Sequence, residues 1–162
     1  GFDHKYVYSE IGYNLKMTDI QAAIGAAQID KLPYFCERRK ENFKEWTRIF
    51  AKYPNYFVLP EATEGANPAW FAFIVTLKEN ASFTRDELTA YLNMKLIETR
   101  NLFAGNMTKQ PGFMNRNFRI AEHLNNTDYI MSNTFFLGTY PGLTSEMFAY
   151  AESVLADFLK DK

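Results

Sequence analysis

The chain has little of what defines several protein classes. It contains one cysteine, Cys36, in 162 residues, which excludes an internal disulfide and fits a reducing, cytoplasmic compartment. It has no run of about 18 apolar residues, so the sequence predicts no membrane-spanning helix. Its formal net charge is -1, which gives no basic footprint for nucleic acid or for an anionic membrane. Neither kind of partner is expected.

Histidine is also scarce, with only His4 and His123 present. The two residues lie far apart in the sequence and lack partners at the spacing of metal ligands, so no metal site is predicted. What the chain does contain is apolar, with 47% hydrophobic and 17% aromatic residues. A chain of this length is one domain by the usual size range and can bury roughly 70% of its unfolded surface.

Capping signals predict where the helices begin. Thr18 with Gln21, and Thr84 with Glu87, each have the spacing of a capping box. The helix that begins after Thr84 should end at about Met94. A helix from Pro33 to about Tyr53 and a last helix after Thr144 would each bury one stripe. The residues of these stripes are Phe35, Phe43, Trp46, Phe50 and Tyr53 in the helix after Pro33, and Met147, Ala151, Val154, Leu155 and Phe158 in the last helix.

Strands are expected between these helices. Residues 69–77 are apolar on both faces, as in an interior strand, and residues 95–102 and 134–137 also have strand patterns. Residues 54–68 should be a loop or an irregular strand and residues 105–116 a loop, and short helices are expected at 120–124 and 128–131. This mixture predicts an α+β fold with a small, mostly antiparallel sheet packed on helices. Residues 1–53 would form a lead-in and the long helices, and residues 54–162 the α+β part.

The segment before the first helix is suited to binding an anion. Gly12 permits a close approach of the backbone, the Asn14 amide can donate to a phosphate oxygen, and Lys16 adds a cation. On local sequence alone, an Asn that satisfies its own turn and an ordinary surface lysine are the alternatives.

Several blocks of the sequence, in the same order, resemble the sugar-nucleotide aminotransferase family of the DegT/DnrJ/EryC1/StrS type, which are pyridoxal phosphate enzymes. Relatives usually have arginine where Lys16 stands, so the charge is kept and the fork geometry is lost. The resemblance is closest to the CDP-4-keto-6-deoxyglucose-3-dehydrase branch. The blocks are Gly12-Tyr13-Asn14, Lys16-Met17-Thr18-Asp19, Gln21-Ala22-Ala23, Leu59-Pro60-Glu61-Ala62-Thr63, Trp70-Phe71, Thr99-Arg100, Leu102-Phe103-Ala104-Gly105-Asn106, Asn126-Thr127-Asp128 and Tyr140-Pro141-Gly142-Leu143-Thr144.

The resemblance implies that residues 1–162 are the small C-terminal domain of the aspartate-aminotransferase-like fold, excised from a longer enzyme. It implies that Asn14, helped by Lys16, binds the phosphate of pyridoxal or pyridoxamine phosphate across a homodimer. The Schiff-base position and the acid beside the pyridine nitrogen would lie on the large domain. No catalytic residue is therefore expected here, and the isolated chain should be inactive. A [2Fe–2S] cluster needs four ligands, which only the parent enzyme could supply.

Four residues are implied to contact the substrate. Phe71 stands where many aminotransferase relatives carry a histidine, and a phenyl ring there suits a dehydrase better than transamination. Arg100, Phe103 and Asn106 fall where relatives bring a loop to the sugar nucleotide, and Arg100 could bind a diphosphate with both arms. The alternatives are an ordinary core phenylalanine at 71 and a structural ion pair at Arg100.

The predicted function is that of a C-terminal domain in a pyridoxamine phosphate-dependent 3-dehydrase, which removes the C3 hydroxyl of a 4-keto-6-deoxyhexose nucleotide in O-antigen or deoxysugar biosynthesis. The expected partners are the sugar nucleotide, the large domain, a second subunit and a reductase. An amino-sugar-forming aminotransferase is the alternative on the same fold. A stand-alone module that stacks RNA bases is a third interpretation, which the net charge opposes.

Overall fold

The computed structural model describes residues 15–160 and 162. The chain divides into two units, residues 1–33 and Tyr34–Lys162. The first unit contains helix α1 (Asp19–Ile29), in which no residue is buried. The Thr18 hydroxyl accepts from the Gln21 amide, and the Gln21 side chain accepts from the Thr18 amide, so the predicted capping box is confirmed. Gly12 and Asn14 lie outside the described residues.

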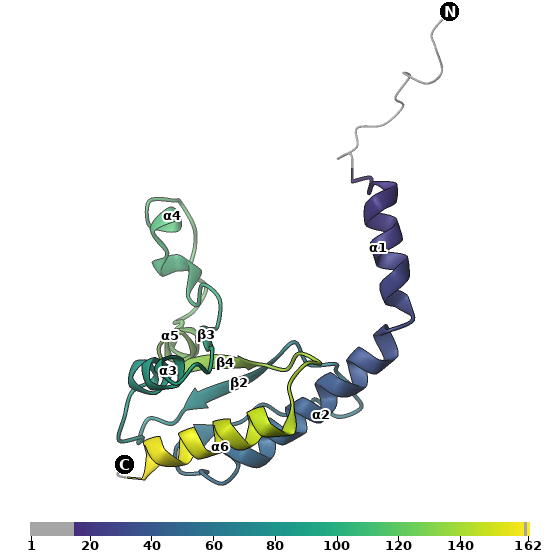
Figure 1. The fold of residues 1–162 in the computed structure, drawn as a ribbon. Coiled ribbons are helices and arrows are strands. Elements are labelled where there is room, and N and C mark those ends of the chain that lie inside the picture. Colours follow the sequence, from purple (N-terminus) through teal and green to yellow (C-terminus); the bar gives the residue numbers. More distant parts are fainter. Residues whose placement is uncertain (1–14, 161) are drawn as a thin grey trace, which may run out of the picture. The chain divides into compact units, whose positions relative to one another are not determined.

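A four-stranded antiparallel sheet organises the second unit (Figure 1). Its strands are β1 (Phe57–Val58), β2 (Ala72–Leu77), β4 (Thr134–Gly138) and β3 (Arg100–Asn101), in that order across the sheet. Strands β2 and β4 are interior, which the apolar pattern of residues 69–77 predicts for β2. The helices are α2 (Leu32–Phe50), α3 (Arg85–Met94), α4 (Pro111–Met114), α5 (Asn125–Asn133) and α6 (Ser145–Leu159), with a short 3₁₀ helix η2 at Met107–Lys109. The α+β prediction is confirmed.

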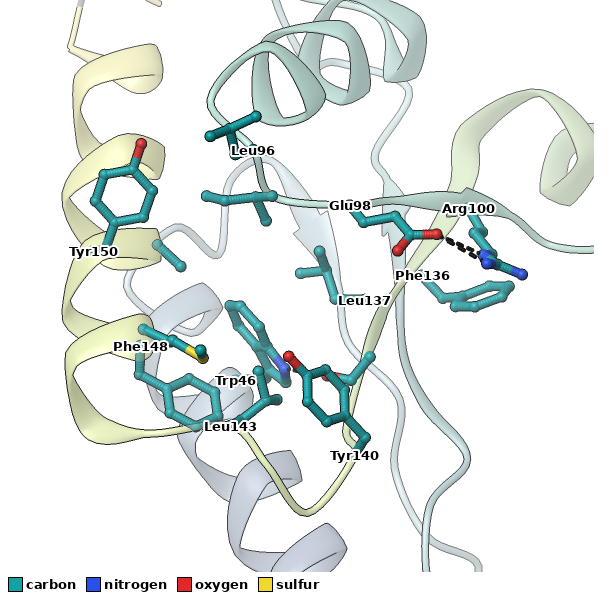
Figure 2. A pocket seen from close by; sticks show the side chains of 14 residues that line it. Trp46, Leu96, Glu98, Arg100, Phe136, Leu137, Tyr140, Leu143, Phe148 and Tyr150 are labelled. Carbon is teal, nitrogen blue, oxygen red and sulfur yellow. Dashed lines mark hydrogen bonds and ion pairs between the residues drawn. The ribbon is translucent and has the colours of Figure 1, made fainter.

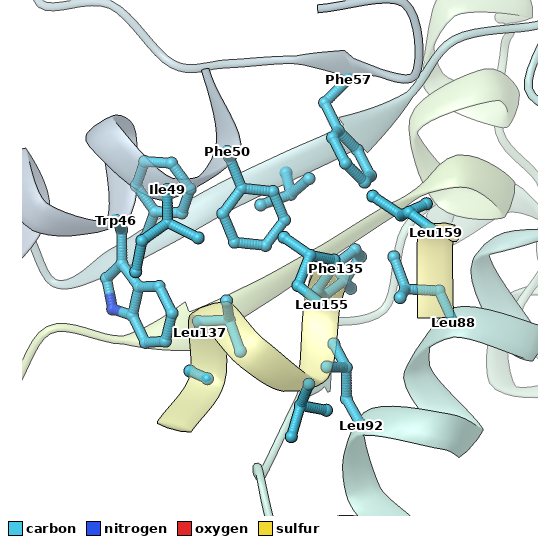
Figure 3. Packing of buried hydrophobic residues seen from close by; sticks show 14 of the residues in the cluster. Trp46, Ile49, Phe50, Phe57, Leu88, Leu92, Phe135, Leu137, Leu155 and Leu159 are labelled. Atoms are coloured by element: carbon cyan, nitrogen blue, oxygen red, sulfur yellow. The ribbon is translucent and has the colours of Figure 1, made fainter. Parts of the chain in front are cut away.

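The register of β2 and β4 separates the sheet into two faces. Phe73 lies opposite Leu137 and Val75 opposite Phe135, and all four side chains are almost completely buried. Because side chains alternate along a strand, these residues share one face, which we call the core face. Helices α2, α3 and α6 contribute most of the rest of this hydrophobic cluster, as Figure 3 shows, and Phe57, Leu77 and Phe83 complete it.

Aromatic rings hold α2 against the core face. Trp46 meets Phe148 of α6 edge to face, with ring centroids 4.9 Å apart, and Phe43 stacks on Trp70 at 4.2 Å. Such pairs contribute about 0.5–1.5 kcal/mol each beyond their buried area. The Trp46 indole nitrogen also donates to the Gly138 carbonyl oxygen at 2.9 Å, so α2 is tied to the end of β4.

Helix starts were predicted better than several other elements. The Thr84–Glu87 capping box is present at α3, and the Thr144 hydroxyl caps α6. The stripe on α6 is wrong by one position, because Phe148 and Leu159 are buried whereas Met147 is half exposed. Of the remaining predicted members, Ala151, Val154 and Leu155 are buried as expected, and Phe158 is partly buried against the core cluster.

Three predictions between the helices were wrong or too long. Residues 105–116, expected to be a loop, contain η2 and α4. Residues 120–124 are not helical, and α5 begins at Asn125. No side chain caps the start of α5, and the residues before it are mostly exposed. Tertiary packing therefore does not offset the cost of helix nucleation at residues 120–124. The strand expected over 95–102 is only Arg100–Asn101, because Leu96 has a left-handed backbone (φ 61°) that breaks an extended chain.

Candidate functional site

The opposite face of the sheet carries an aromatic cluster centred on Phe136 of β4. The ring centroid of Phe136 lies 6.1 Å from that of Phe71 and 5.9 Å from that of Phe103. Phe136 is 9% exposed, whereas Phe71 and Phe103 are 69% and 77% exposed. Large apolar side chains are seldom grouped on an open surface without a binding role. Phe71 therefore does not belong to the hydrophobic core of this chain.

Arg100 adds a charge to this cluster. It pairs directly with Phe136 across the β3–β4 ladder, and residues opposite each other in a ladder point to the same face. Figure 2 shows the Arg100 side chain beside the Phe136 ring, with an ion pair to Glu98 at 2.9 Å. Both members of that pair are exposed. We call Phe71, Arg100, Phe103 and Phe136 the aromatic–arginine patch.

A polar contact from helix α2 holds the backbone at Phe71. One guanidinium nitrogen of Arg39 donates to the carbonyl oxygens of Trp70 and Phe71, at 2.9 and 3.0 Å. The buried Thr139 hydroxyl, next to the end of β4, donates to the Trp70 carbonyl at 2.7 Å. The position of Phe71 is therefore fixed by the core side of the domain.

Asn106 lies in the same loop as Phe103, but its side chain turns inward. It is 2% exposed, and its amide nitrogen donates to Asp128 Oδ1 at 2.7 Å. Its amide oxygen accepts from both the backbone and the hydroxyl of Thr108. Of the four residues implied to contact substrate, the structure brings together Phe71, Arg100 and Phe103, and it places Asn106 beneath the loop.

Beside the patch, a cavity of about 420 Å³ opens between the end of β4, the segment before β3 and helix α6 (Figure 2). Arg100 and Phe136 belong to its lining, so it adjoins the patch. Its other walls are largely apolar, and they include Trp46, Leu96, Tyr140, Leu143, Phe148 and Tyr150. A mostly apolar hollow with a few polar groups at one side is typical of ligand sites.

Among the predicted cofactor ligands, only Lys16 lies in the described part of the chain. It is exposed and precedes α1. The start of α1 is closed by the Thr18–Gln21 capping box, and Asn14 is not described. The described residues by themselves therefore do not form a pyridoxal phosphate site, and the assignment of Asn14 and Lys16 stays a prediction.

Ion pairs lower the pKa of two carboxylates in the second unit, Asp128 and Glu152. The Lys109 ammonium, and secondarily the Asn106 amide, lower the pKa of Asp128. Arg48, followed by Lys52, lowers the pKa of Glu152 to about 2 and ties α2 to α6. No group of three metal-ligating side chains occurs among the described residues. Within the same residues, no helix is both long and apolar enough to cross a bilayer.

Sequence reasoning missed three residues that build this site, namely Phe136, Arg39 and Asp128. Phe136 could have been found, because strict alternation in the strand Thr134–Gly138 puts it on the opposite face from Phe135 and Leu137. Arg39 and Asp128 act through contacts made far along the chain, at separations of 22 to 100 residues. A local pattern carries no signal for such contacts.

The comparisons with known proteins agree with this architecture. The chain is 48% identical, over 98% of its length, to the lipopolysaccharide biosynthesis protein RfbH of Salmonella typhimurium, of which it covers 36%. It is 40% identical, again over 98% of its length, to the dTDP-4-dehydro-2,6-dideoxy-D-glucose 3-dehydratase of Saccharopolyspora spinosa, of which it covers 34%. The chain thus spans about a third of the length of the curated relatives that it matches.

A solved structure supports the fold. The GDP-4-keto-6-deoxy-D-mannose-3-dehydratase of E. coli, with bound hydrated PLP, matches 93% of this chain with a TM-score of 0.83 and 26% identity, and 38% of that protein is covered. The sequence model of the DegT/DnrJ/EryC1/StrS aminotransferase family matches residues 1–155. This chain belongs to the DegT/DnrJ/EryC1/StrS aminotransferase family.

Proposed function

We propose that this chain is the C-terminal part of a pyridoxal or pyridoxamine phosphate-dependent sugar-nucleotide 3-dehydratase. We propose further that the aromatic–arginine patch contacts the sugar nucleotide. One observation carries the second proposal: Phe71 from one segment, and Arg100 and Phe103 from another, gather around Phe136 on one exposed surface. The names of the relatives support the first proposal, with the chain covering about a third of each.

The chemistry of the patch suits a sugar joined to a diphosphate. Phenyl rings exclude water from the apolar face of a sugar or base, and a guanidinium binds phosphate oxygens with two parallel hydrogen bonds. The Glu98–Arg100 pair is exposed, and such pairs contribute little stability, so Arg100 can exchange its partner at small cost. The cofactor, where bound in the whole enzyme, supplies the amine that activates the C4 ketone.

Phe71 favours dehydration over amino transfer. A phenyl ring neither donates nor accepts a proton, so this position offers no acid or base beside the substrate. An aminotransferase is the second candidate, since the family that matches is named for that activity. The proposal also includes a CDP nucleotide, a cytoplasmic location, and a homodimer in which Asn14 and Lys16 bind the cofactor phosphate. It further includes a reductase and a [2Fe–2S] cluster elsewhere in the parent enzyme.

The test is a product assay on the full-length enzyme loaded with pyridoxamine phosphate. CDP-, GDP- and dTDP-linked 4-keto-6-deoxyhexoses are supplied in turn, with and without glutamate and with and without an electron-donating reductase, because replacing the C3 hydroxyl by hydrogen consumes two electrons. The products are identified by NMR. We expect loss of the C3 hydroxyl from at least one of them. Glutamate-dependent formation of a 4-amino sugar, with the C3 hydroxyl retained, would identify an aminotransferase instead.

A variant pair tests the patch in the same assay. Arg100→Gln removes a charged donor to the diphosphate, which corresponds to an increase in KM on the order of 10- to 100-fold. Arg116→Gln is the matched control, because Arg116 is exposed in the same region and lies outside the patch. Equal KM values for the two variants would remove Arg100 from the substrate site.

A further inference from the structure

The backbone of Phe103 has an unusual conformation. Its φ is +49°, in the left-handed region that bulky residues seldom adopt, and a residue held there costs on the order of 1–3 kcal/mol. In this conformation its ring is 77% exposed. Neither the strain nor the exposure of the ring is favourable by itself, so neighbouring contacts must hold the loop in place.

Asn106, three residues later, makes those contacts. Its amide nitrogen binds Asp128 of α5, and its amide oxygen accepts two bonds from Thr108, at 3.0 and 2.7 Å. Its backbone amide donates to the Met131 sulfur, and its carbonyl accepts from Lys109. This single side chain therefore joins the Phe103 loop to helix α5 and starts the 3₁₀ helix that follows.

Gly105 packs closely against helix α5. Gly105 has φ +63°, and a Cβ atom there would lie 2.4 Å from Met131 Cγ. The loop backbone thus rests directly on α5. Lys109 pairs with the other oxygen of Asp128 at 2.8 Å, which holds that carboxylate toward Asn106.

We infer that Asn106 is a positioning residue, which fixes Phe103 in the aromatic–arginine patch through Asp128, and that it does not itself contact the substrate. With 2% of its surface exposed and its amide bonded to Asp128 and Thr108, Asn106 is shielded from a ligand on the patch. The link to Phe103 rests on the structure, and its effect on ligand binding rests also on the proposed function.

The experiment uses the full-length protein and four variants: Asn106→Ala, Asp128→Ala, the double variant, and Asn117→Ala as an exposed asparagine control from the next loop. Hydrogen exchange is measured at the Phe103 amide, which donates to the Asn101 carbonyl at 2.7 Å. Removing a hydrogen bond to a charged group should speed exchange at Phe103 on the order of 10- to 100-fold in Asn106→Ala and in Asp128→Ala. Asn117→Ala should leave it unchanged.

Non-additivity distinguishes a shared link from two independent effects. If Asn106 acts through Asp128, the double variant should exchange no faster than the faster single variant within about twofold. A product of the two separate effects, or wild-type exchange in Asn106→Ala, would overturn the inference. Asp128 is more exposed than Asn106. The Asp128→Ala variant therefore keeps the test valid even if Asn106→Ala disturbs the wider loop.

The functional readout is the dissociation constant for CDP, GDP and dTDP, measured by calorimetry. If Asn106 positions Phe103, Asp128→Ala and Asn106→Ala should weaken nucleotide binding in parallel. If Asn106 contacts the substrate directly, only Asn106→Ala should weaken binding, and hydrogen exchange at Phe103 should stay unchanged. The second pattern would overturn the inference. If the wild type binds none of the three, the proposed function fails, and hydrogen exchange alone then decides whether Asn106 holds Phe103.

Discussion

Phe135 and Phe136 are neighbours in β4, but they serve opposite faces of the sheet. Phe135 is fully buried among residues of the core face. Phe136 lies beneath two exposed rings and beside Arg100. Three helices close the core face, whereas the patch face ends in side chains that meet solvent. The strand thus places a core residue next to a residue of the proposed binding patch, and substitutions on the two faces should have different effects.

The largest effect should follow Phe135→Ala. Truncating a fully buried phenylalanine removes its transfer free energy and leaves a cavity, which costs about 3–5 kcal/mol. Urea unfolding of the chain, followed by far-UV circular dichroism, measures this loss. A cost as small as that of Phe136→Ala would mean that the core face is no more tightly packed than the patch face.

Phe136→Ala should have an intermediate effect on stability, about 1.5–3 kcal/mol, because the ring is largely buried but its neighbours Phe71 and Phe103 can relax toward solvent. In the full-length enzyme it should also weaken binding of the sugar nucleotide, since it supports both exposed rings. The same unfolding curves and a binding isotherm test both statements. A stability cost with unchanged affinity would separate Phe136 from recognition.

Phe71→Ala and Phe103→Ala should change the free energy of unfolding by less than about 0.5 kcal/mol, as expected for exposed positions. Their effect should instead be on affinity for the sugar nucleotide, measured in the full-length enzyme. Val58→Ala, at another half-exposed apolar position, is the control. Loss of stability without loss of affinity would reverse the roles given to the two faces.

The smallest effect should come from the ion pairs between α2 and α6 on the core side. Arg48 and Lys52 hold the pKa of Glu152 at about 2, below its ordinary 4.5. The ionised form is therefore favoured in the folded state, so this contribution is present above about pH 4.5 and is lost as the pH falls toward 2. Glu152→Gln should flatten that part of the stability–pH curve, and about 1 M salt should do the same.

The sequence predicted what local chemistry controls. The capping boxes at Thr18 and Thr84 and the interior strand followed directly from residue type and spacing. The errors arose where distant contacts decide. The stripe on α6 is set by how Phe148 meets Trp46. The strand expected over 95–102 is shortened by the left-handed backbone of Leu96, in a turn that Asn93 closes through hydrogen bonds with Thr99.

The candidate site shows the same division. Motif resemblance found Phe71, Arg100 and Phe103, which the sheet then brings together. It could not find that Asn106 points inward, because its amide group is bound to Asp128, which lies 22 residues further along the chain. Chain topology, rather than residue type, assigns that role.

The chain's two tryptophans have a consequence for how it can be observed. Trp46 and Trp70 both pack against the Phe43–Phe73 side of the domain, and the Trp46 indole is bonded to the end of β4. Among the rings of the patch there are only phenylalanines. Tryptophan emission from this chain is therefore a signal of helix α2 leaving the sheet, and it will be silent about the loop that carries Phe103. A spectroscopic probe of that loop has to be introduced within it.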